Sequence, residues 1–145
     1  MSQENVDLVL SVQPTGDVDL AELHRDDEAW AAWMEVLARH AYPEFECVRP
    51  SVPGGEVYRG SDGLRALSLD WLAPWTTYHS VVEEVIDCGD RVLTLQRSRA
   101  TLADSAQEIE FAPGNVWTVR DGKIARVEYY ADQMEALKAV GLEDF

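Results

Sequence analysis

The chain has 145 residues, of which 46% are hydrophobic and 27% are charged, and this is the composition of one globular domain. Its 27 acidic and 12 basic residues leave a formal charge of −15 at pH 7. A field of that sign repels phosphate groups, so we expect neither nucleic acid nor a membrane surface as a partner.

The N-terminal segment has neither the basic stretch nor the apolar core of a signal peptide, and no apolar run reaches the length of a membrane span. The two cysteines, Cys47 and Cys88, lie far apart and match no metal-ligand spacing, and no histidine cluster occurs. The pair Gly54-Gly55 matches no phosphate-binding loop. These patterns predict a cytoplasmic protein with reduced thiols that holds no metal and no cofactor.

The N-terminal part of the chain has the apolar spacing of helices. A short helix is predicted over Val6–Val12, and a longer one runs from Arg25 to His40. The inward stripe of the longer helix falls at i, i+3, i+4 and i+7 and consists of Trp30, Trp33, Met34 and Leu37. His24 and His40 are predicted to lie at the surface and at the helix end.

A short strand over Glu44–Val48 and a loop over Pro50–Gly55 follow in the prediction. Ser61 is the predicted N-cap of another helix, and Pro74 marks where that helix stops. This helix turns four apolar side chains inward, namely Leu64, Leu67, Trp71 and Leu72.

The second half changes to the alternating pattern of strands. The predicted strands are Thr77–Ile86, Arg91–Ala100, Gln107–Arg120 and Ile124–Ala131. A turn is predicted at Cys88–Asp90, and the pair Asp121-Gly122 predicts a two-residue hairpin of type I′. Asp132 is the predicted N-cap of a short terminal helix that ends near Gly141. Helices followed by an antiparallel meander predict an α+β domain over residues 1–145.

The odd positions of Gln107–Val119 are the more apolar ones, so they are predicted to face inward. The pair Pro113-Gly114 is a candidate bulge that would shift this register. On the next strand the apolar set includes Tyr129. Asn115 and Tyr129 are therefore predicted to be polar groups on one apolar concave face.

Several turn, cap and core motifs of the chain resemble the SnoaL-like families of the NTF2-like superfamily. They are Tyr58–Arg65, Ile86–Leu93, Val116–Ile124, Tyr130–Asp132 and Glu135–Leu137. The resemblance covers nearly the whole chain and implies a cone: a strongly curved antiparallel sheet wrapped around helices, with one deep pocket. It also implies a homodimer that pairs through the sheet. Members include polyketide cyclases, ketosteroid isomerases, scytalone dehydratase, limonene epoxide hydrolase and non-catalytic binding or scaffold proteins.

Compared with ketosteroid isomerases, Asn115 falls where those enzymes place the protonated aspartate of their oxyanion hole. An amide can donate the same hydrogen bond, although Asn115 also suits a structural role beside the Pro113 kink. The isomerase base falls near Ser51, where the chain has no carboxylate. Glu46 and His79 are therefore the candidates for moving a proton, and a half-exposed strand histidine is the alternative for His79.

The candidate substrate-binding residues are mainly aromatic and are Trp33, Trp71, Trp75, Tyr78, Arg97, Trp117 and Tyr129. Such side chains suit a flat apolar ligand, and the same spacing also suits a packed core. Gln96 and Arg97 are candidates to reach the pocket, and the parity that Arg97 shares with Leu93 and Leu95 favours Arg97 of the two. The alternative for Arg97, and the commoner one, is a solvated arginine at the strand edge. An inward arginine needs a carboxylate partner or an anionic ligand.

Three functions are compatible with these residues. The first is binding and conversion of a small hydrophobic carbonyl or polycyclic compound by cofactor-independent acid/base chemistry, with Asn115 polarising an oxygen. Isomerisation, aldol cyclisation, dehydration and epoxide hydrolysis are the reaction types that the resemblance implies. The second is binding of such a molecule without turnover, and the third is a dimeric scaffold whose cone is filled by its own side chains.

Overall fold

The structure is a computed structural model that describes residues 2–50, 52 and 56–142. Its helices are α1 (Ser2–Ser11), α2 (Leu20–Arg25), α3 (Asp27–Ala38), α4 (Gly60–Leu72) and α5 (Gln133–Ala139). Its strands are β1 (Ala41–Val48), β2 (Tyr58–Arg59), β3 (Trp75–Cys88), β4 (Arg91–Leu102), β5 (Glu108–Phe111), β6 (Gly114–Arg120) and β7 (Lys123–Tyr130). Ser51 and residues 53–55 of the predicted loop lie outside the described residues.

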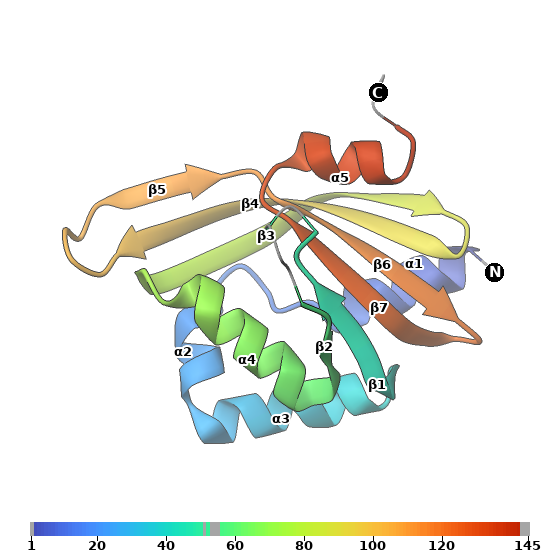
Figure 1. Ribbon diagram of the computed structural model, residues 1–145, viewed down its shortest axis with the longest axis horizontal. Coiled ribbons are helices and arrows are strands. Elements are labelled where there is room, and N and C mark those ends of the chain that lie inside the picture. The colour runs from blue at the N-terminus through green and yellow to red at the C-terminus, as the bar shows by residue number, and fades with distance from the viewer. Residues whose placement is uncertain (1, 51, 53–55, 143–145) are drawn as a thin grey trace.

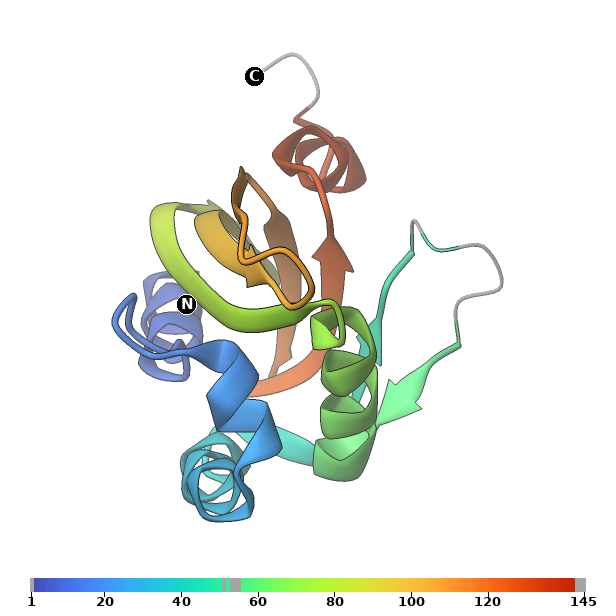
Figure 2. The ribbon, with the colours of Figure 1, turned by 90° about the vertical axis from the view of Figure 1, so that its left-hand side faces the viewer.

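The seven strands form one sheet in the order β2-β1-β7-β6-β4-β3, and β5 pairs with β4 beside β6. Neighbouring strands are antiparallel except β1 and β7, which are parallel. The sheet is strongly curved, with α2, α3 and α4 across its open side and α5 on its outer face (Figures 1 and 2). The predicted α+β fold with a curved sheet around helices is confirmed.

The predicted helix from Arg25 to His40 is the end of α2 followed by α3. Asp26 breaks the two helices apart, because its backbone is extended and its carboxylate accepts hydrogen bonds from the N–H groups of Glu28 and Ala29. The helix α2 has its own cap, Asp19, which accepts from Ala21 N–H. The predicted apolar stripe of α3 is confirmed, with Trp30 and Leu37 buried.

The prediction of Ser61 as an N-cap is wrong, because α4 begins directly after strand β2. Arg59 occupies the capping position without a side-chain hydrogen bond, and Ser61 already lies within the helix. Gly60 makes the abrupt turn with φ of +68°, and a Cβ atom there would lie 2.9 Å from the carbonyl oxygen of Pro43. The glycine therefore allows strand and helix to join without a capping residue.

The predicted strand Gln107–Arg120 is two strands, β5 and β6, interrupted at Ala112–Pro113. Both pair with β4 in one register, with Ser98 opposite Phe111 and Leu95 opposite Gly114. The interruption therefore inserts no extra residue, contrary to the predicted bulge. The odd positions stay on one face across Pro113, as the alternation predicts.

Strand β4 separates two apolar clusters, because both of its faces are buried over residues 92–96. On the concave side Val92 joins Trp117 of β6 in a cluster with α1, α3 and α4. On the convex side Leu93 and Leu95 pack with Val116 of β6 and with α5. Helix α5 is thus held on the outer face of the sheet, away from the other helices (Figure 1).

Both predicted ends of α5 are confirmed. The Asp132 carboxylate accepts a hydrogen bond from Met134 N–H at the N-terminus. At the C-terminus Gly141 has φ of +80° and its N–H bonds to the Lys138 carbonyl, while Leu142 N–H bonds to the Leu137 carbonyl. This pair of backbone hydrogen bonds is a Schellman motif, which satisfies the last carbonyls of the helix. The predicted Asp121-Gly122 hairpin is also confirmed, since both residues have positive φ.

Gly114 sets how closely α5 approaches the sheet. A Cβ atom at Gly114 would lie 2.7 Å from the Cβ atom of Ala136. We therefore expect Gly114→Ala to lower the free energy of unfolding by about 1–3 kcal/mol through overpacking, measured by urea denaturation. Adding Ala136→Gly removes the opposing methyl group, so the double variant should lose less stability than the two single losses together. Fully additive losses would contradict this contact.

Candidate functional site

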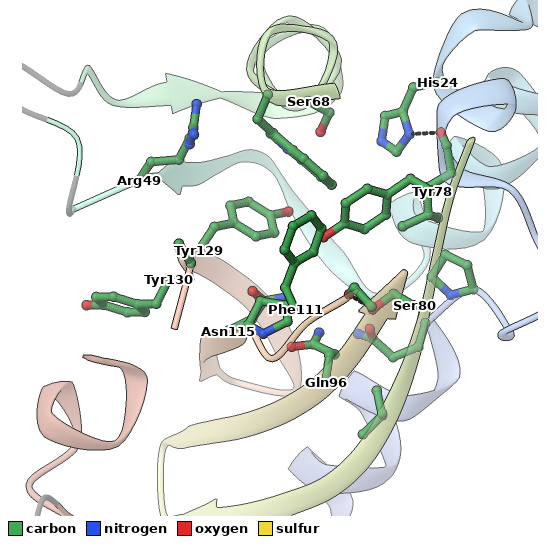
Figure 3. A pocket seen from close by; sticks show the side chains of 18 of the residues that line it. His24, Arg49, Ser68, Tyr78, Ser80, Gln96, Phe111, Asn115, Tyr129 and Tyr130 are labelled. Atoms are coloured by element: carbon green, nitrogen blue, oxygen red, sulfur yellow. Dashed lines mark hydrogen bonds between the residues drawn. The ribbon is translucent and has the colours of Figure 1, made fainter. Parts of the chain in front are cut away.

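A cavity of about 350 Å³ lies between the concave face of the sheet and helices α2, α3 and α4. This is within the size range of small-molecule sites. Strands β3 to β7 supply one wall, and the three helices together with the segment after α1 supply the other. Most of the labelled side chains in Figure 3 come from these two walls, and those of Ser68, Tyr78, Phe111, Asn115 and Tyr129 surround one space.

Aromatic rings make up much of the cavity wall and contact one another. The Trp71 and Tyr78 rings meet edge to face at 4.8 Å, and Phe111 stacks on Tyr78 at 6.0 Å between centroids. Trp75 meets Phe111 at 5.2 Å. Each of these rings thus packs against at least one other ring of the wall. The predicted binding residues that line the cavity are Trp33, Trp71, Trp75, Tyr78, Trp117 and Tyr129.

Asn115 and Tyr129 lie directly opposite each other on β6 and β7, and both line the cavity. The prediction that they share one apolar face is thereby confirmed. Within the described residues neither side chain has a hydrogen-bond partner, although both carry a polar group that can donate. Burial raises the pKa of Tyr129 well above its ordinary value, so its hydroxyl keeps the proton that it can donate. Both side chains can therefore donate a hydrogen bond to a ligand in the cavity.

Glu46 is not among the described residues that line the cavity. Its carboxylate is bound by Arg126 at 2.8 Å and by Arg59 at 2.7 Å. These hydrogen bonds, the one from Arg126 first, lower the pKa of Glu46 and keep it ionised. The structure therefore does not bring Glu46 to Asn115, because the guanidinium groups of the neighbouring strands β2 and β7 hold it at the sheet surface.

The structure also places His79 and Arg97 on the opposite face of the sheet. The cavity-lining residues of the hairpin β3–β4 are Trp75, Tyr78, Ser80, Val82, Gln96 and Ser98. His79 Nδ1 lies 3.1 Å from the Gly16 carbonyl oxygen, and Arg97 pairs with Glu83 at 3.4 Å. The prediction favoured Arg97 because it shares parity with Leu93 and Leu95. Those leucines face α5, so their parity marks the convex side and Gln96 is the residue that faces inward.

His24 lines the cavity, contrary to the predicted surface position. Its side chain is buried beside the rings of Trp30 and Trp33, with centroids 5.1 and 5.5 Å away. The signal in the sequence is the helical spacing of Leu20 and His24, which requires α2 to be recognised as a helix of its own. The dashed line in Figure 3 marks the hydrogen bond between the His24 imidazole and a backbone carbonyl of the same helix.

The tautomer of His24 follows from its one hydrogen bond. Nδ1 lies 2.7 Å from the Leu20 carbonyl oxygen, which can only accept, so Nδ1 carries the proton and Nε2 holds the lone pair. Burial lowers the pKa of His24 below its ordinary value. The hydrogen bond to Leu20 opposes this shift, and the nearby Arg65 and Arg25 add to it. His24 is therefore a neutral imidazole at pH 7 and can accept a proton.

The described residues show no metal centre and no membrane-crossing helix. They contain no group of three or more His, Cys, Asp or Glu side chains placed to hold a metal ion. Among them no helix is both long and apolar enough to cross a membrane.

A curved sheet, a covering of helices and one internal cavity define the class of NTF2-like folds. The model of the SnoaL-like domain family matches residues 18–127, and the chain belongs to that family. No match was found among curated proteins. The family membership and the cone fold that the sequence motifs predict are thus both confirmed.

Solved structures share the fold at low sequence identity. A putative SnoaL-like polyketide cyclase from Jannaschia is 21% identical with a TM-score of 0.65, covering 96% of this chain and 92% of that one. TerC, co-crystallised with polyporic acid, is 20% identical with a TM-score of 0.65, covering 94% and 98%. An NTF2-like protein of unknown function from Burkholderia pseudomallei is 16% identical with a TM-score of 0.64, covering 95% and 98%.

The lowered pKa of His24 makes stability depend on pH in a defined direction. The unfolded chain takes up this proton near pH 6.5 and the folded chain only at lower pH, so the free energy of unfolding falls as the pH drops below 6.5. We expect His24→Gln to remove the contribution of this residue to the pH dependence. That contribution is a slope of at most about 1.4 kcal/mol per pH unit in the free energy of unfolding. The measurement is urea denaturation between pH 5 and 8, with His40→Gln as the matched control. Identical slopes in the wild type and His24→Gln would show that His24 is not held neutral.

Proposed function

We propose that this protein binds a small aromatic carbonyl compound in the cavity and converts it by acid/base chemistry of its own side chains. The observation that carries the proposal is the unpartnered donor pair of Asn115 and Tyr129 within an aromatic wall. Each of these side chains carries an N–H or O–H group that can donate to an oxygen atom of a ligand in the cavity.

The donor pair matches the needs of a developing oxyanion. When a proton leaves the carbon beside a carbonyl group, negative charge moves onto the carbonyl oxygen. Two donors fixed on neighbouring strands stabilise that charge without reorganising, and a water-poor aromatic wall strengthens the effect. In this assignment Asn115 and Tyr129 hold the oxygen of the substrate, and the aromatic rings hold its flat body.

His24 is the residue that we assign as the proton acceptor in place of Glu46 and His79. Its neutral state and the lone pair on Nε2 are the properties that a general base needs. Proton removal beside a carbonyl begins isomerisation, aldol cyclisation and dehydration of hydroxycarbonyl compounds alike. The substrate therefore decides which of these reactions follows.

Binding without turnover is the second candidate function. The observation that favours it is that the described residues lining the cavity include no carboxylate, so His24 would have to act alone as the base. The open volume supports both of these functions over a scaffold whose interior is filled. The TerC structure with polyporic acid shows that one protein of this fold was crystallised with a small organic molecule, which supports screening such compounds.

Ligand binding is tested by thermal denaturation against steroids, aromatic polyketides, terpene epoxides and fatty acids. A ligand at a hundred times its Kd adds about 2.7 kcal/mol to the free energy of unfolding. For a chain of this size we expect the Tm to rise by roughly 5–10 °C with the correct aromatic carbonyl class. A Tm that stays constant with every aromatic carbonyl compound would count against the proposal.

Turnover is tested on the compounds that bind. We expect Asn115→Ala, Tyr129→Phe and His24→Gln each to lower kcat at least about tenfold, because each removes a group that contacts the reacting atoms. Tyr42→Phe, which removes a hydroxyl bonded to the Arg120 carbonyl at the surface, should leave kcat unchanged. Unchanged rates in all three cavity variants would contradict the assignment, and binding without any turnover would support the second candidate.

A further inference from the structure

The described side chains that line the cavity carry charge of one sign. Among the described lining residues Arg49 is the one with a permanent charge, and no carboxylate accompanies it in the lining. Arg49 directly follows strand β1, and its side chain is one-third exposed (33%), so it stands at the edge of the cavity. This cation lies beside a cavity in a chain whose formal charge is −15.

The ion pair that holds Arg49 is weak. Asp70 of α4 lies 3.5 Å away with its side chain 77% exposed, and an exposed pair of that kind contributes little. A guanidinium has five N–H donors, and this contact engages one of its nitrogen atoms. Within the part of the chain that the structure describes, most of the hydrogen-bonding capacity of Arg49 therefore remains available to a ligand.

Two buried polar atoms in the cavity wall have no partner within the described residues: Nε1 of Trp71 and Oε1 of Gln96. Trp71 directly follows Asp70 on α4, which puts its N–H on the helix that Arg49 reaches. Gln96 is only 6% exposed, and its side chain points into the cavity (Figure 3). Buried polar groups are nearly always hydrogen-bonded. A ligand would therefore supply an acceptor for the Trp71 N–H and a donor for the Gln96 oxygen.

The cationic group of Arg49 and the acceptor oxygen of Gln96 lie in different parts of the cavity wall. Figure 3 shows Arg49 and Gln96 on opposite sides of the group of rings that includes Phe111 and Tyr129. A guanidinium and an indole N–H both donate, whereas a carboxamide oxygen accepts. The ligand that complements this arrangement is elongated, with an anionic oxygen group at one end and a hydroxyl at the other.

We propose, building on the proposed function, that the ligand is an aromatic acid whose anionic group binds Arg49 and Trp71 and whose distal hydroxyl donates to Gln96. The acidic group is a carboxylate or an ionised enol, and the two share the chemistry of a charged oxygen acceptor. Asp70 competes with this group for the guanidinium. Arg49 is thus a specificity residue that selects anions, separate from the donor pair of Asn115 and Tyr129.

The test uses three matched compounds: 6-hydroxy-2-naphthoic acid, its methyl ester, and 2-naphthoic acid, which lacks the hydroxyl. Binding is followed at pH 7.5 by quenching of tryptophan fluorescence, because Trp33, Trp71, Trp75 and Trp117 line the cavity. Isothermal titration calorimetry gives the Kd independently. We expect the hydroxy acid to bind at least about tenfold more tightly than its ester, since hydrogen bonds to charged groups are among the strong ones.

Variants separate the contacts. Arg49→Gln should abolish the preference for acid over ester, and Asp70→Asn should increase it by removing the competing carboxylate. Trp71→Phe keeps an aromatic ring at this position but removes the indole N–H, and it should weaken binding of the acid about three- to tenfold. Gln96→Met should weaken the hydroxy acid and leave 2-naphthoic acid unchanged. Arg99→Gln, on an exposed arginine paired with Glu108, is the matched control that should bind as the wild type does.

The outcomes distinguish this inference from the proposed function. Equal binding of acid and ester to the wild type, or a preference that survives in Arg49→Gln with an unchanged Tm, overturns the inference and leaves aromatic binding in place. Failure of all three compounds and of every aromatic carbonyl compound in the thermal panel overturns both. A preference lost in Arg49→Gln and kept in Arg99→Gln supports the assignment of Arg49.

Discussion

The burial of strand β4 on both faces is the constraint on which the rest of the structure depends. Leu93 and Leu95 need an apolar cover on the convex side, and α5 supplies it. The concave side then turns Thr94, Gln96 and Ser98 toward the interior, where helices arch over the curved sheet. A sheet that packs against α5 on its convex side and curves around α2, α3 and α4 on its concave side leaves room for an internal cavity.

The same arrangement places charged side chains on the sheet surface and neutral polar side chains in the cavity. The acidic and basic side chains of β1, β3, β4 and β7 pair at the sheet surface, as in the contacts of Glu46 with Arg126 and of Glu83 with Arg97. The cavity keeps neutral groups that donate or accept hydrogen bonds, and Arg49 stands at its edge. In such a low-dielectric interior a few polar atoms dominate recognition, because the aromatic rings around them offer only shape.

Local patterns predicted the parts of the fold that local forces build. The apolar stripe of α3, the Asp132 cap and the Asp121-Gly122 hairpin each depend on residues within a few positions of one another. The prediction failed where a neighbour distant in sequence decides. Gly60 joins β2 to α4 because the Pro43 carbonyl lies against it, and nothing near Ser61 reveals that contact.

The sequence by itself determined the SnoaL-like fold, the common face of Asn115 and Tyr129, and most of the aromatic wall, because alternation along a strand is a local property. Only the tertiary structure decided that His24 and Gln96 face the cavity and that Glu46, His79 and Arg97 do not. On β4 the apolar pair Leu93 and Leu95 faces α5, whereas the cavity side carries polar residues such as Gln96, so apolar composition pointed to the wrong face. Which face meets which helix is settled by packing.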